Sequence, residues 1–167
     1  MALLRLRKDE DPILRKTSRP VTVFDKKLRT LAEDMIETMH AEFGLGLAAV
    51  QVGKLRRMLT YDLYDDTGPG VLINPELISS EGTCDGVEGC LSVTETRGYV
   101  ERPQKLVIKA HDLDGNEVTI EAEDLFARVL CHEMDHMDGI LFIDKMSRIY
   151  VPEENEEDEE FENGEEA

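Results

Sequence analysis

The chain has 167 residues, 41% of them hydrophobic, so it can form one domain with a sizeable core and gives no reason to expect two. Its formal net charge of −18 provides no long-range attraction for phosphates, which disfavours binding to DNA or RNA. Charged residues interrupt the N-terminus at once, and no stretch approaches eighteen apolar residues, so we expect a cytoplasmic protein without a membrane segment.

The negative charge is concentrated at the C-terminus. Residues 151–167 hold ten acidic residues and no basic one, which leaves 27 acids against 19 bases, a net charge of −8, in residues 1–150. A segment with so little apolar content cannot offset its chain entropy. We therefore expect one globular domain over residues 1–150 and a disordered acidic tail over residues 151–167. The three cysteines are an odd number and are expected to be reduced thiols.

The first predicted element is an amphipathic helix over residues 24–43. Its apolar residues recur at helical spacing, and charged residues lie between them. Either Asp25 or Thr22 can cap its start, and Gly44 ends it.

Small residues are gathered in the stretch that follows, residues 44–53, and would let another backbone approach closely. The stretch follows a helix rather than a strand and lacks the third spaced glycine of a dinucleotide-binding loop, so that interpretation is discarded. Gln51 is its polar side chain. It is interpreted either as a buried amide satisfied by backbone groups or as a donor aimed into a site.

The middle of the chain has the pattern of strands. Residues 58–63 and 71–74 are β-rich runs, the second of them ending before Pro75. Residues 105–112 and 116–123 flank an Asp-Gly turn, which predicts a hairpin. With no repeats and no alternation of strands and helices, the class is α+β, with antiparallel strands packed around a few helices.

The last predicted element is a short helix over residues 124–139, ended by its glycine. It contains His132, Glu133 and His136. Positions four apart share a helix face, so both imidazoles can reach one metal ion with the glutamate beside it. Such a pair can occur by chance, but two of only four histidines fall on these positions.

A catalytic site of this kind usually takes three protein ligands and leaves one position open for water. No histidine follows Gly139, so the third ligand has to come from elsewhere. Cys90 lies in a predicted loop with two glycines, residues 86–93, where a thiolate can turn toward a metal. An isolated cysteine is more often a small buried hydrophobe, but the need for a third ligand weakens that interpretation.

Three stretches now point to a family. GLGLAAVQ (44–51), EGCLS (88–92) and HEMDH (132–136) occur in the order and approximate spacing of the signature motifs of peptide deformylases. The chain resembles that family over about its first 148 residues. The resemblance implies a fold in which the H-E-x-x-H helix lies against antiparallel strands. It also implies a hydrolase that removes the formyl group from the N-terminal formylmethionine of newly made polypeptides and releases formate.

The metal ligands that the resemblance implies are Cys90, His132 and His136. It implies Fe²⁺ in the cell, while Zn²⁺, Ni²⁺ or Co²⁺ can occupy the same site, because a Cys-His₂ donor set suits several divalent metals. Water activated by the metal would be the nucleophile.

Glu133 would act as general acid and base, with Gln51 and the backbone N–H of Leu91 beside the reacting carbonyl. The peptide would add as a strand near two glycines, and its methionine side chain would enter an apolar slot. The substrate-binding residues implied in this way are Leu45, Gly46, Val87, Gly89, Leu125 and Val129.

The chain also departs from the family pattern. Thr94 stands where many relatives have proline, which is expected to loosen that loop without affecting the chemistry. Some relatives end in a basic helix suited to ribosomal RNA, whereas this chain ends in acidic residues. We therefore expect a monomer that acts on formylmethionyl nascent peptides, near the ribosome but not docked on it through a basic C-terminal helix.

Two alternatives stay open at this point. A zinc endopeptidase shares the H-E-x-x-H motif but normally recruits a downstream ligand that this chain lacks. The second alternative is a metal-binding protein without catalytic activity that interacts with a partner through its acidic tail.

Overall fold

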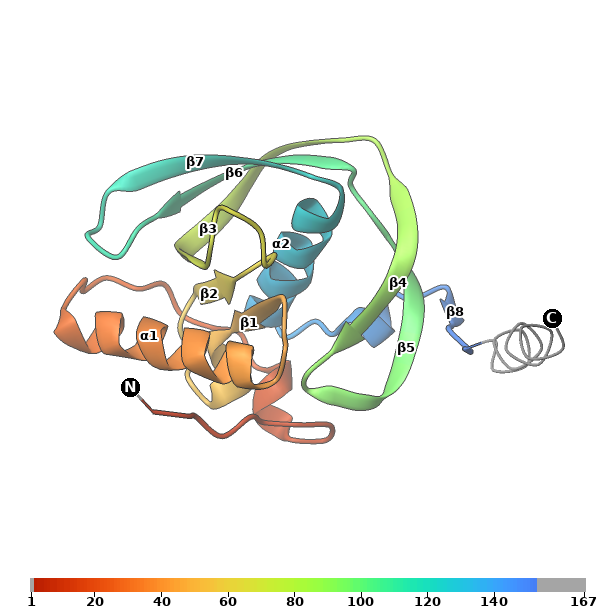
Figure 1. The fold of residues 1–167 in the computed structure, drawn as a ribbon, viewed down its shortest axis with the longest axis horizontal. Coiled ribbons are helices and arrows are strands. Elements are labelled where there is room, and N and C mark those ends of the chain that lie inside the picture. The colour runs from red at the N-terminus through yellow and green to blue at the C-terminus, as the bar shows by residue number, and fades with distance from the viewer. Residues whose placement is uncertain (1, 153–167) are drawn as a thin grey trace, which may run out of the picture.

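The structure, a computed structural model, describes residues 2–152 and is drawn in Figure 1. Its helices, including three short 3₁₀ turns labelled η, and its strands are, in chain order, η1 (Pro12–Arg15), α1 (Lys26–Ala41), β1 (Gly46–Ala48), η2 (Ala49–Val52), β2 (Met58–Tyr61), β3 (Gly70–Glu81), β4 (Cys84–Cys90), β5 (Val93–Arg102), β6 (Lys105–His111), β7 (Glu117–Glu123), α2 (Asp124–Met137), η3 (Phe142–Asp144) and β8 (Arg148–Ile149).

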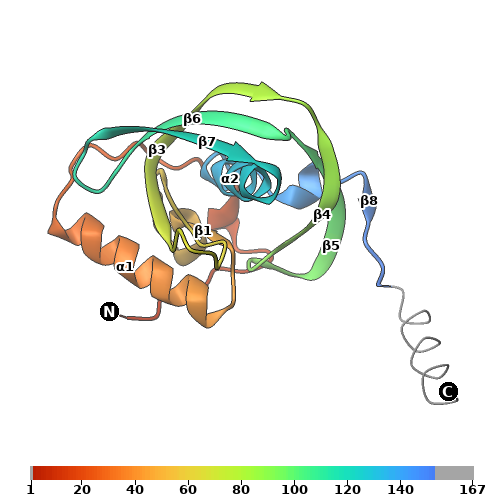
Figure 2. The same ribbon diagram turned by 45° about the horizontal axis from the view of Figure 1, so that its top comes forward.

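Within this part of the chain the strands form two sheets whose neighbouring strands are all antiparallel. One has the order β1-β2-β3-β6-β7 and the other the order β4-β5-β8. Figure 2 views α2 almost end-on, with β3, β6 and β7 arching over one side of the helix and β4 and β5 on the other. The predicted α+β class, with antiparallel strands around the H-E-x-x-H helix, is confirmed.

The larger sheet carries one helix on each face. Because side chains alternate along a strand, neighbouring residues of β2 pack into different buried clusters. Met58 packs with residues of α1 (Leu28, Ala32, Met35 and Met39), and Leu59 packs with residues of α2 (Ala127, Leu130 and Met137). In β3 the same alternation sends Ile73 to the α1 side and Leu72 to the α2 side. The sheet therefore forms a shared wall between two apolar cores, and α2 is held by one of them.

Helix α1 follows the predicted pattern of apolar spacing and capping. The side chain of Asp25 accepts a hydrogen bond from the backbone N–H of Leu28 at 3.0 Å, so Asp25, rather than Thr22, is the N-cap. The helix ends at Ala41, before the predicted stop at Gly44.

Two predicted boundaries are wrong. Residues 86–90, expected in a loop, belong to strand β4, which ends at Cys90. Strand β3 does not stop before Pro75 but continues to Glu81. Its pairing with β6 shifts register between Ile73 and Glu76, and Asn74 there has a φ of 51°. A bulge accommodates a proline that cannot donate to the ladder.

The described residues contain no helix long and apolar enough to cross a membrane. The predicted acidic tail lies outside the described residues from position 153 onward. The boundary at residue 150 stays a prediction.

Candidate metal centre and substrate pocket

Helix α2 carries two of the proposed ligands and the glutamate between them. His132, Glu133 and His136 are all buried, and the two imidazole rings lie 5.0 Å apart between centroids. The chain turns away at Gly139, with a φ of 73°; a Cβ there would lie 2.4 Å from the carbonyl oxygen of Arg15. Only glycine fits this turn, which allows the chain to leave the helix one turn after His136.

Strand β4 brings Cys90 to the helix. Its sulfur lies 3.3 Å from Nε2 of His136, and one ligand atom from each of Cys90, His132 and His136 lies within 4.8 Å of the other two. One thiolate and two imidazoles are a donor set that fits a tetrahedral divalent ion with one position left open. The structure therefore brings together the three residues that the sequence predicted as ligands.

His132 is held in the orientation that a ligand needs. Its Nδ1 lies 2.8 Å from Oε1 of Glu88, which leaves Nε2 to face the site. Burial disfavours the charged form of this ring, but hydrogen bonds with Cys90 and Glu88 outweigh it and raise the pKa of His132 to about 10. Binding a metal at Nε2 would therefore displace a proton.

His136 has the opposite electrostatic environment. Burial, together with the charge of His132, lowers its pKa well below the ordinary value, so the ring stays neutral, as a metal ligand must be. Its Nδ1 is buried without a hydrogen-bond partner among residues 2–152.

A buried ionic network, which the sequence did not predict, supports His132. Arg102 donates to both carboxylate oxygens of Glu88 at 2.8 Å and to Asp135 at 2.6 Å. Arg128 adds a bond to Glu88 at 2.8 Å. Burial alone would raise the pKa of Glu88, but hydrogen bonds to Arg102 and His132 lower it to about 2. The carboxylate is therefore ionised, and it links β4, β5 and α2 behind the ligand.

Glu133 lies against strand β1 at Gly46. A Cβ at Gly46 would lie 2.8 Å from Oε1 of Glu133 and 2.9 Å from Val129, so only glycine permits this approach. Oε2 of Glu133 is buried, with no hydrogen-bond partner in the described part of the chain. Burial raises the pKa of Glu133 to about 7, against the opposing charge of His132.

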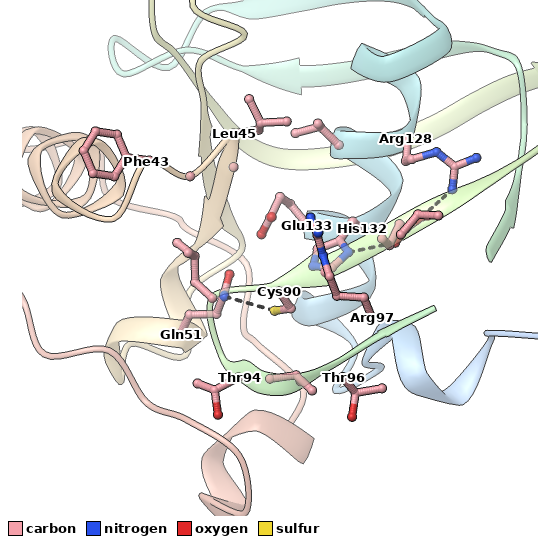
Figure 3. A pocket seen from close by; sticks show the side chains of 18 of the residues that line it. Phe43, Leu45, Gln51, Cys90, Thr94, Thr96, Arg97, Arg128, His132 and Glu133 are labelled. Carbon is pink, nitrogen blue, oxygen red and sulfur yellow. Dashed lines mark hydrogen bonds and ion pairs between the residues drawn. The ribbon is translucent and has the colours of Figure 1, made fainter. Parts of the chain in front are cut away.

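Gln51 combines the two interpretations that the sequence left open. Its Oε1 accepts the backbone N–H of Ala48 at 2.9 Å, which fixes the amide orientation. Its Nε2 therefore faces the site, donates to Ser92 Oγ at 3.1 Å and lies 3.6 Å from Cys90 Sγ. Figure 3 shows Gln51 pointing toward Cys90, with Glu133 and His132 beside them.

A pocket of about 440 Å³ opens beside these groups. Cys90, His132, Glu133, Gln51 and Leu91 lie in its wall, whereas His136 is buried and is not among the lining residues. The six predicted substrate-binding residues all line it: Leu45, Gly46, Val87, Gly89, Leu125 and Val129. Sequence reasoning did not single out Phe43 and Thr96, which line it as well and are labelled in Figure 3.

Thr94, expected to loosen its loop, is tied down instead. Its backbone N–H donates to Asp9 Oδ1 at 3.2 Å, and its hydroxyl donates to the same oxygen at 3.1 Å. Proline could make neither bond, since it lacks both donors.

An α+β fold in which a cysteine lies beside the two histidines of an H-E-x-x-H helix, as a group that could hold a metal ion, is typical of a metal-dependent hydrolase. The polypeptide deformylase family model matches residues 3–151. A peptide deformylase of Clostridium acetobutylicum is 52% identical over 147 residues, which are 88% of this chain and 97% of that protein. One from Caldicellulosiruptor bescii is 52% identical over 157 residues, 94% of this chain and 93% of the relative.

Solved structures agree with the sequence relatives. The peptide deformylase of Thermotoga maritima superposes with a TM-score of 0.84 at 41% identity, covering 87% of this chain and 99% of that one. The Ehrlichia chaffeensis enzyme in complex with actinonin gives 0.85 at 38% identity, covering 89% and 91%. This chain belongs to the peptide deformylase family.

Proposed function

We propose that this protein removes the formyl group from the N-terminal formylmethionine of newly made polypeptides and releases formate. One observation carries the proposal. The ligand atoms of Cys90, His132 and His136 lie within 4.8 Å of one another, and Oε2 of Glu133 is buried with no hydrogen-bond partner among the described residues. Cys90, His132 and Glu133 line a pocket whose wall also includes apolar side chains.

The three ligands fit a divalent metal, which we propose to be Fe²⁺ in the cell, with Zn²⁺, Ni²⁺ or Co²⁺ able to replace it. When bound, such an ion lowers the pKa of water and polarises a carbonyl oxygen. Metal analysis of protein prepared without oxygen is expected to find iron. Its absence would contradict the assignment of the metal without touching the assignment of the ligands.

Glu133 is assigned to the proton transfers. Its Oε2, which has no hydrogen-bond partner within residues 2–152, can take a proton from the attacking water and pass it to the departing amine. Gln51 and Leu91 are assigned to the oxyanion. The Gln51 amide presents N–H groups to the site because its oxygen is occupied by Ala48. Loss of one such donor typically costs about 10²–10³ in rate.

The substrate is proposed to bind as a strand between the two sheets. In the described residues β1 and β4 each end a sheet, and Gly46 of β1 and Gly89 of β4 both line the pocket. An extended peptide between two free edges gains hydrogen bonds that do not depend on its sequence. The apolar wall formed by Leu45, Val87 and Val129 suits a methionine side chain.

Formate release from formyl-Met-Ala-Ser tests the proposal, with Glu133→Ala as the comparison. We expect the variant to retain the metal and to lose turnover by about 10²–10⁴-fold, the usual contribution of a general acid and base. A fully metallated wild-type protein that releases no formate would refute the function. Cleavage within unformylated peptides would favour an endopeptidase.

A further inference from the structure

The N-terminal segment forms a strap, residues 2–9, without regular secondary structure. Four of its backbone N–H groups donate to other parts of the protein: Ala2 to Asp34 Oδ1 (2.7 Å), Leu4 to Thr38 Oγ1 (2.9 Å), Arg7 to the carbonyl of Gln51 (2.7 Å) and Asp9 to the carbonyl of Ser92 (2.6 Å). The strap therefore connects α1 to the metal site.

Its last two bonds reach both segments that carry the proposed oxyanion donors. Gln51 lies in η2, and Ser92 follows Leu91 in the turn between β4 and β5. These segments already touch through the hydrogen bond between the Gln51 amide and the Ser92 hydroxyl. The strap joins them a second time, through their backbone carbonyls.

The side chain of Asp9 adds a further contact between the strap and this region. Its carboxylate accepts the N–H of Thr94 at 3.2 Å and the hydroxyl of Thr94 at 3.1 and 3.2 Å. Asp9 has a φ of 54°, a left-handed conformation that persists in residues other than glycine where surrounding contacts hold it. Asp9 thus binds the turn at the carbonyl of Ser92 and the start of β5 at both donors of Thr94.

We propose that Asp9 and Thr94 are positioning residues for deformylation. Their contact, the strap clasp, holds the Leu91 N–H and the Gln51 amide in the relative orientation in which both can donate to the oxyanion. The inference rests on the roles proposed for Leu91 and Gln51. Neither Asp9 nor Thr94 has to touch the reacting atoms, since both act on the orientation of the turn between β4 and β5.

The test uses the metal-loaded full chain in four forms: wild type, Asp9→Ala, Thr94→Val and the double variant. We expect kcat for formyl-Met-Ala-Ser to fall about tenfold in Asp9→Ala and about threefold in Thr94→Val, the size of effect that ordinary hydrogen bonds give. KM should change by less than about twofold, because Thr94 lines the pocket but lies outside the apolar wall formed by Leu45, Val87 and Val129. Amide hydrogen exchange at residues 91–94 should become faster.

The double variant shows whether Asp9 and Thr94 act through one shared contact or independently of each other. Once Asp9→Ala has removed the acceptor, losing the Thr94 hydroxyl should lower kcat no further. Asp9→Asn keeps an acceptor oxygen and should recover most of the lost turnover.

A matched control exists in the turn before β3. Thr67 donates its N–H at 3.0 Å and its hydroxyl to Asp65 Oδ1, with the same chemistry and exposure as the clasp, and neither residue lines the pocket. Asp65→Ala and Thr67→Val should leave kcat and the exchange of residues 91–94 unchanged.

The clasp is refuted if Asp9→Ala and Thr94→Val leave exchange at residues 91–94 as slow as in wild type. A lowered melting temperature with unchanged kcat would also refute it, and so would a full threefold loss from Thr94→Val in the Asp9→Ala background. If Asp9→Ala does not fold, Thr94→Val alone decides. Because exchange needs no turnover, failure of the proposed function would appear separately, as a wild type that releases no formate.

Discussion

The two sides of the metal site are held in different ways. On the α2 side, His132 rests on Glu88, whose carboxylate is bound by Arg102 and Arg128 in a buried ionic network. On the turn side, Cys90 is followed by a turn that backbone hydrogen bonds and the exposed contact between Asp9 and Thr94 tie to the N-terminal strap. Buried charges are costly to leave unpaired, whereas exposed bonds are worth little each. We therefore expect the first side to control stability and metal binding, and the second to control turnover.

The largest expected effect is on the buried network. Arg102→Met would leave the carboxylates of Glu88 and Asp135 without their shared cation and should lower the free energy of unfolding by about 3 kcal/mol or more. The melting temperature should fall by about 10 °C, measured by calorimetry. The control is Arg29→Met, whose partner Asp114 is exposed, and it should cost less than about 1 kcal/mol. Equal losses of unfolding free energy in Arg102→Met and Arg29→Met would show that the buried network stabilises the fold no more than an exposed ion pair does.

A second prediction isolates metal binding on the same side. Glu88→Gln keeps the shape of the side chain but weakens the support of His132, so metal affinity should fall about 10- to 100-fold, measured by competition with a chelator. Asp135→Asn removes a charge from the same network without touching a ligand. It should change metal affinity far less. Unchanged affinity in Glu88→Gln would show that the carboxylate supports only the fold.

A third prediction sharpens the assignment of the pocket. Leu45→Lys would place a charge in the apolar slot and should raise KM for formyl-Met peptides about tenfold, the usual cost of a misplaced polar group there. Leu77→Lys, at a half-exposed site on β3 outside the pocket lining, should leave KM unchanged. An unchanged KM in Leu45→Lys would show that this residue does not face the methionine side chain.

The smallest expected effect concerns a surface ion pair outside both regions. Hydrogen bonding to Arg15 lowers the pKa of Asp144 from its ordinary 3.8, so its stabilisation is present above pH 3.8 and is lost as the pH falls through the lower folded value. Because the pair is exposed, Asp144→Asn should cost less than about 1 kcal/mol at pH 7. Urea unfolding should show this difference shrinking toward pH 3. A difference that grows in acid would contradict the assignment.

The helices were predictable because their signals are local. In α1 the apolar spacing and the cap at Asp25 lie within a few residues of each other. Strand β4 was not predictable, because Gly86 and Gly89 interrupt its alternation of side chains. It forms through pairing with β5, and Arg128 donates to the carbonyls of Cys84 and Gly86.

The candidate site, like the fold, could be predicted from the sequence only in part. The grouping of the three proposed ligands could be predicted, since two are four residues apart on a helix and the motif with Cys90 supplies the third. The support of His132 could not, because Arg102 lies 14 residues and Arg128 lies 40 residues from Glu88 in the sequence. Contacts at that separation are set by how β4, β5 and α2 pack, and no local pattern encodes them.

X-ray absorption of zinc-loaded protein tests the central claim most directly, that Cys90, His132 and His136 hold one ion. Wild-type protein should bind one equivalent, with one sulfur at about 2.3 Å and nitrogen at about 2.0–2.1 Å. Cys90→Ala should lose the sulfur signal. A wild-type spectrum without sulfur, or a sulfur signal that survives in Cys90→Ala, would contradict the claim.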